Sequence, residues 1–150
     1  MDVDRVAATH EAAHAVVALR LAFPPAAVSI RPKPGESGRM YHGPATRDIE
    51  GTPGELMGLA AVALAGGIGE TFARVGRTRL VPLSAYGPTD YANAWTFAEL
   101  ASPDNPDRAF RLALLRARSA VGTAWGAVER VASGLRDKTV LTADEVRHLV

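Results

Sequence analysis

The 150-residue sequence contains no cysteine. This absence excludes disulfide bridges, thiolate metal ligands and cysteine nucleophiles, so any bound metal must be held by His, Asp or Glu. A strong charge of one sign is also missing, because 17 basic and 16 acidic residues leave a formal net charge of +1. There is no basic block with interleaved aromatic residues. We therefore expect no nucleic-acid partner.

Long hydrophobic runs are scarce as well. The longest, residues 56–68, is interrupted by glycine and is shorter than the roughly 20 residues that a membrane-spanning helix needs. The N-terminus begins with acidic residues, whereas a secretory signal begins with basic ones. These features predict a cytoplasmic protein without direct membrane insertion.

The composition and the apolar spacing of the sequence fit one mostly helical domain over residues 1–150. A hydrophobic fraction of 47% in a chain of this length is enough for a substantial core. Apolar spacing and capping residues predict helices at 4–22, 52–76, 87–102 and 141–150, and a helical region from 103 to about 136 that bends near Gly122. Two short strands are expected at 27–32 and 38–43, as a small β-hairpin or sheet after the first helix.

Several predicted helix ends depend on local chemistry. Asp4 is the expected N-cap of the first helix, and Thr52 with Glu55 resembles a capping box at the second. Gly76 is expected to end the second helix. Thr142 and Glu145 are expected to form another capping box at the start of the last helix. The glycines inside 52–76 weaken the helix, and we expect them to permit close approach of another helix.

The sequence THEAAHAVVA, residues 9–18, carries the strongest chemical signal. On a helix, His10 and His14 lie one above the other, so both imidazoles can reach one metal ion. Glu11 lies one residue further round, where it can act on water at the open side of that ion. This HExxH arrangement is typical of zinc hydrolases, with two ligands and a general base on one turn. The surrounding alanines and valines indicate a buried face, where unpaired imidazoles would be costly.

A catalytic zinc site needs a third protein ligand. The candidates are an acidic residue or one of the remaining histidines, His42 and His148. Two acids stand out. Glu70 lies on a small, apolar face of the predicted helix at 52–76, and Asp90 lies in the first turn of the next predicted helix. Spacing and composition alone leave the choice between them open.

The sequence resembles the peptidase domain of FtsH-type AAA+ zinc proteases. THEAAHAVVA is similar to that family's zinc helix, and AVSIRPKPGESGRMYH to the strand–turn–strand that follows it. ALAGGIGETF resembles its second helix, YGPTDYANAWTFA the segment that supplies the third ligand, and residues 124–150 its C-terminal helices. The order and spacing hold along the whole chain, although an arginine usual in the family is replaced by Gly67.

The resemblance implies a role for each candidate residue. His10, His14 and Asp90 would be the ligands of a Zn²⁺ ion, and Glu11 would be the catalytic base. Glu70 would lie near the zinc and contact a ligand without binding the ion itself. The implied function is a zinc-dependent metallopeptidase that hydrolyses peptide bonds in peptides or unfolded segments. We expect it as a stand-alone domain, without the family's ATPase or transmembrane segment, and with a homo-oligomer or a separate ATPase as a possible partner.

Two other interpretations of the same residues remain. A catalytically inactive binding or adaptor module could use zinc for stability alone, but it would not need Glu11. A helical interaction protein without metal would simply pack the two histidines.

Overall fold

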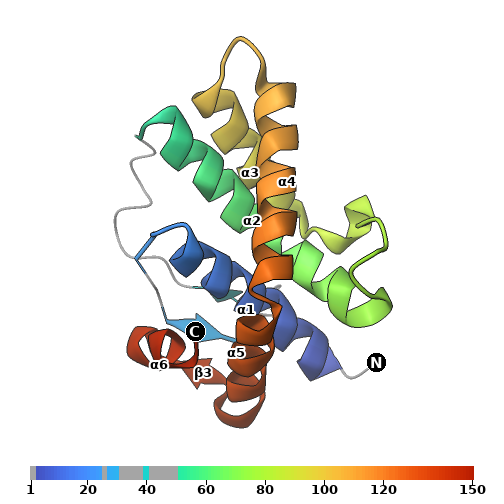
Figure 1. Cartoon of the computed structure of the whole chain (residues 1–150), viewed down its shortest axis with the longest axis vertical. Coiled ribbons are helices and arrows are strands. Elements are labelled where there is room, and N and C mark those ends of the chain that lie inside the picture. The colour runs from blue at the N-terminus through green and yellow to red at the C-terminus, as the bar shows by residue number, and fades with distance from the viewer. Residues whose placement is uncertain (1–2, 25–26, 31–38, 41–50) are drawn as a thin grey trace.

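A computed structural model describes residues 3–24, 27–30, 39–40 and 51–150, and within them the chain is mostly α-helical (Figure 1). The predicted fold class is thereby confirmed. The helices are α1 (Val3–Arg20), α2 (Pro53–Val75), α3 (Pro88–Ala101), α4 (Pro106–Thr123), α5 (Trp125–Lys138) and α6 (Ala143–Leu149), with a short 3-10 helix, η2 (Leu83–Ala85).

Predicted caps mark three of the helix ends. The Thr52 hydroxyl accepts a hydrogen bond of 3.2 Å from the backbone N–H of Glu55 at the start of α2. Gly76 ends this helix with a φ of 93°, a conformation that glycine adopts without strain. At α6, Thr142 and Glu145 form both hydrogen bonds of the capping box. These ends are set by local chemistry, which is why the sequence predicts them.

Two details of the helix predictions were wrong. Helix α1 begins at Val3, so Asp4 lies inside its first turn instead of capping it. The helical region after residue 103 is two separate helices, which meet at Ala124, two residues beyond the bend expected near Gly122. Ala124 has a φ of −98° and a ψ of 20°, which ends α4 and begins α5.

A small antiparallel sheet lies beside α1. Its strands are β1 (Val28–Ser29), β2 (Arg39–Met40) and β3 (Val140–Leu141), in the order β2-β1-β3. The predicted pairing of the first two strands is confirmed, with Val28 opposite Met40, although residues 31–38 and 41–43 lie outside the described part of the chain. The third strand was not predicted. Because β3 pairs with β1 on the side opposite β2, β1 is the central strand of the described sheet.

Helix α1 runs through the middle of the molecule (Figure 1). It packs against α2, which in turn contacts α3 and α4, and on its other side against α5. The core is built mainly from aliphatic side chains of these helices and of the sheet, with a few aromatic ones. Its largest fully buried members are Leu64, Ile68, Leu135, Leu141, Val16, Val17, Val28, Val121, Val128, Val131 and Val146.

Glycines let the central helices approach closely, as expected. A Cβ atom at Gly69 would lie 2.6 Å from the Cβ of Ala13 on α1. One at Gly67 would lie 2.9 Å from the backbone oxygen of Ala85, in the segment that leads into α3. Both separations are shorter than carbon contacts allow. The small residues of α2 therefore set the distances between α1, α2 and the start of α3.

The apolar run at 56–68 forms the central part of α2. At 23 residues, α2 is the one helix in the described ranges that is long and apolar enough to cross a membrane. However, 78% of its apolar 18-residue window is buried inside the protein. It therefore occupies the place of a core helix.

Candidate metal centre

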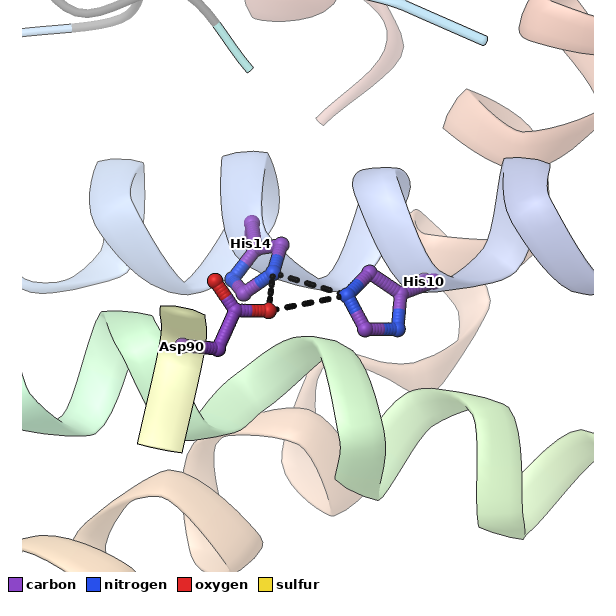
Figure 2. A group of neighbouring side chains, drawn as sticks. All are labelled: His10, His14 and Asp90. Carbon is purple, nitrogen blue, oxygen red and sulfur yellow. Dashed lines mark hydrogen bonds and ion pairs between the residues drawn. The ribbon is translucent and has the colours of Figure 1, made fainter. Parts of the chain in front are cut away.

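The predicted motif and one predicted acid meet between α1 and the start of α3 (Figure 2). His10 and His14 project from adjacent turns of α1 toward α2. Asp90 comes from the first turn of α3, which Gly87 and Pro88 begin. The helix dipole favours a carboxylate at this position. Figure 2 shows the Asp90 carboxylate reaching both imidazole rings.

Three atoms form a nearly equilateral triangle at this site. Nε2 of His10 and Nε2 of His14 lie 3.1 Å apart, and Oδ2 of Asp90 lies 3.1 Å from the first and 3.0 Å from the second. Zinc bonds of roughly 2.0–2.1 Å at tetrahedral angles separate two ligand atoms by about 3.3 Å. The spacing of the three atoms is therefore close to that of ligands around one zinc ion.

The far side of each imidazole determines where its proton lies. Nδ1 of His14 is 2.6 Å from the backbone oxygen of Val62, and Nδ1 of His10 is 3.2 Å from Oε2 of Glu70. Both partners can only accept, so each Nδ1 carries a hydrogen and donates it. In a neutral imidazole this leaves the Nε2 lone pair free to bind a metal. Three electron-pair donors then converge on one point, an arrangement that suits a bound metal cation.

Electrostatics at the site favour positive charge. Burial is the largest single effect and lowers the pKa of His10 and of His14, but the hydrogen bonds to the neighbouring acids and the negative charges of those acids together outweigh it. The pKa of His14 is raised, and that of His10, which also bonds Glu70, rises to about 10. Burial raises the pKa of Asp90, yet the hydrogen bonds from both histidines hold that pKa well below its usual range. In the metal-free protein, protons therefore hold the cluster together, and a metal ion must displace them.

Gly66 on α2 forms one wall of the site. A Cβ atom at this position would lie 2.4 Å from Nε2 of His14 and 2.5 Å from Nε2 of His10. These distances are only slightly longer than the roughly 2.0–2.1 Å of a zinc–nitrogen bond. Any side chain at residue 66 would therefore compete with a metal ion for the same space, whereas glycine leaves that space open.

Glu70 lies behind His10, and its hydrogen bond is to Nδ1, not to the triangle of Nε2 and Oδ2 atoms. That hydrogen bond lowers the pKa of Glu70, although burial opposes the effect, and Arg74 adds a second contact of 3.1 Å to the other carboxylate oxygen. The geometry thus separates the two acids that the sequence left as alternatives. Of the remaining histidines, His148 is exposed on α6 and His42 lies outside the described residues.

Glu11 is buried in the same turn of α1, with 6% of its surface exposed. It is close enough for its negative charge to raise the pKa of both His10 and His14. Its carboxylate is near the two histidines but is not one of the three atoms of the triangle.

Sequence reasoning missed three contributors to the site. The backbone oxygen of Val62 orients His14, and no side-chain pattern reveals a backbone acceptor. Arg74 follows Glu70 at helical i,i+4 spacing, a signal that was available but unused. Gly66 is one of the interior glycines of the predicted helix at 52–76, but its closeness to the histidines depends on how α1 packs on α2.

No protein family model matches the chain, and no curated protein has a significantly similar sequence. The resemblance to FtsH-type peptidase domains therefore remains a prediction from the motifs, and the site geometry has to carry the functional argument.

Proposed function

We propose that this protein is a zinc-dependent metallopeptidase of the HExxH type. The observation that carries the proposal is the triangle of His10 Nε2, His14 Nε2 and Asp90 Oδ2, set beside the buried Glu11. Two neutral nitrogens and one carboxylate oxygen form a ligand set that suits a catalytic zinc, because three protein ligands leave a position for water or substrate.

Each residue of the site has a separate role in the proposed peptide hydrolysis. Zinc held by the two histidines and Asp90 would supply Lewis acidity, which makes water a stronger acid and polarises a carbonyl group. Glu11 accepts a proton from the attacking water and returns it to the leaving nitrogen. Glu70 and the backbone oxygen of Val62 hold the two rings in the tautomer that exposes Nε2.

The substrates are peptides or unfolded protein segments. An extended peptide can add to the edge of a sheet through backbone hydrogen bonds, with little dependence on its side chains. Among the described strands, β2 and β3 lie at the edges. We place the protein in the cytoplasm, where a homo-oligomer or a separate ATPase partner would deliver unfolded chains to it.

One observation favours a second candidate, the zinc-stabilised adaptor without activity. His10 and His14 on α1, Asp90 on α3 and the Val62 oxygen on α2 tie three helices together at one point. A metal ion there would stabilise the fold whether or not Glu11 took part in chemistry.

One experiment separates the two. The purified protein, loaded with zinc and measured by elemental analysis, is incubated with fluorescently labelled casein, together with Glu11→Gln. A matched control is Glu99→Gln, which changes an exposed glutamate on α3. The peptidase proposal requires one zinc per chain in all three proteins, cleavage by the wild type and by Glu99→Gln, and none by Glu11→Gln. Zinc without cleavage in any of them supports the adaptor, and no zinc at all excludes both.

A further inference from the structure

The outer surface of α4 is unusual in composition. Six positions at helical spacing share one exposed face of this helix and contain arginine, leucine and one serine, with no acid. They are Arg108, Arg111, Leu112, Leu115, Arg116 and Ser119. Leu115 is 65% exposed and Leu112 42% exposed, although leucine side chains are usually buried.

The segment after α2 extends this surface. The Arg118 guanidinium donates hydrogen bonds of 2.7 Å to the backbone oxygen of Arg77 and 3.3 Å to that of Arg79. Arg77 and Leu115 also line the same shallow depression. Leu80, directly after Arg79, is 90% exposed. Arginines and bare leucines from two segments distant in sequence therefore lie side by side.

Few acids lie in the segments that form this surface, and the one acid of α4 is Asp107 in its first turn. Residues 71–89 and 108–128 contain seven arginines and no Asp or Glu. Among the described residues, Arg74 is the one of these seven that forms an ion pair, with Glu70. The overall charge of only +1 thus conceals a strongly cationic side, which the rest of the chain offsets.

We propose that this basic–apolar face, made of Arg77, Arg79, Leu80, Leu112, Leu115 and Arg116, binds the surface of an anionic phospholipid bilayer. Leucines that project from the protein can enter the boundary between headgroups and acyl chains, while arginines beside them meet lipid phosphates. The face therefore provides both components of peripheral membrane binding. The proposal is independent of the metal centre, because none of these six residues belongs to it.

An acidic protein partner is the competing occupant. Stable protein interfaces centre on aromatic or arginine anchors that fill well-formed pockets. This face has no aromatic residue among its six members, and its Leu80, 90% exposed, lies on an irregular segment and fills no pocket of its own. A lipid surface, which needs no matching pocket, suits it better.

Flotation with vesicles tests the proposal on the full chain. Vesicles of phosphatidylcholine alone are compared with vesicles containing about one third phosphatidylglycerol, at low and high salt. We expect binding to the anionic vesicles only, weakened by salt. Each basic residue near an anionic membrane surface strengthens binding about fivefold. The double variant Arg79→Gln/Arg116→Gln should therefore bind about 25-fold more weakly than the wild type. Leu80→Ser/Leu115→Ser should bind at least about tenfold more weakly.

Control variants show whether the face itself is responsible. Arg147→Gln removes an arginine from exposed α6, and Leu80→Met keeps an apolar side chain, so both should bind like the wild type. Circular dichroism confirms that each variant is folded. Absence of binding, equal binding to neutral vesicles, or loss of binding in Arg147→Gln would overturn the proposal. Binding of poly-glutamate without binding of vesicles would also overturn it, and would identify an acidic protein as the partner.

Discussion

Gly66 of α2 faces His10 of α1 so closely that a Cβ atom at position 66 would lie 2.5 Å from Nε2 of that histidine. We therefore expect Gly66→Ala to abolish zinc binding. Alanine is the better helix former by about 1 kcal/mol, so a loss of metal could not come from a weaker helix. Elemental analysis and zinc titration of the purified variant measure the effect.

Gly54→Ala is the matched control, because the Cβ atom at position 54 of the same helix would have only the Thr52 hydroxyl near it, at 3.9 Å. This variant should bind zinc like the wild type. If Gly66→Ala also kept a full zinc ion, the metal could not lie among the three atoms of the triangle.

The two acids of the site should respond differently to loss of charge. Asp90→Asn removes an anionic ligand atom, and we expect it to weaken zinc binding more than about 100-fold. Glu70→Gln leaves the three ligand atoms in place and changes the partner of His10 Nδ1 and of Arg74. Loss of such a hydrogen-bond partner of a ligand weakens metal binding by about 10–100-fold. Competition with a fluorescent zinc chelator gives both affinities. The reverse order would make Glu70 the ligand.

The stability of the metal-free protein should depend on pH in a specific direction. Asp90 and Glu70 raise the pKa of His10 from 6.5 to about 10 despite its burial. The stabilising charge on His10 is therefore fully present below pH 6.5 and is lost as the pH rises through about 10. Zinc-loaded protein should not show this loss, because the metal takes the place of the proton.

Urea unfolding of both forms across that pH range measures the difference. A parallel decline in the zinc-loaded protein would show that the metal does not replace the proton on His10.

Removal of zinc should destabilise the fold, because its ligands join α1 to α3 and His14 also bonds to α2. Zinc at 100 times its dissociation constant stabilises the native state by about 2.7 kcal/mol. For a chain of this size that corresponds to a fall in Tm of roughly 5–10 °C on chelation. Differential scanning calorimetry with and without EDTA measures the fall, and Asp90→Asn, which lacks the ligand, should be nearly insensitive.

The sequence predicted the parts of the structure that depend on neighbouring residues. Thr52, Gly76 and Thr142 act locally, so the ends of α2 and the start of α6 could be inferred. The pair His10 and His14 could also be inferred, because helical spacing alone places their rings on one face.

The remaining features arise from tertiary packing. Strand β3 comes from the far end of the chain and pairs with β1 only in the folded structure. The difference between Asp90 and Glu70 depends on where α3 begins relative to α1, which spacing along the chain does not reveal. The contacts of Gly66 and of the Val62 oxygen likewise follow from the depth at which α1 packs on α2.

The central claim is that one metal ion binds among His10, His14 and Asp90. A crystal of the zinc-loaded protein, measured on both sides of the zinc absorption edge, tests it most directly. We expect a single strong anomalous peak, about 2.0–2.1 Å from Nε2 of both histidines and from a carboxylate oxygen of Asp90. A zinc-saturated crystal with no peak there, or with its peak at other residues, would contradict the account.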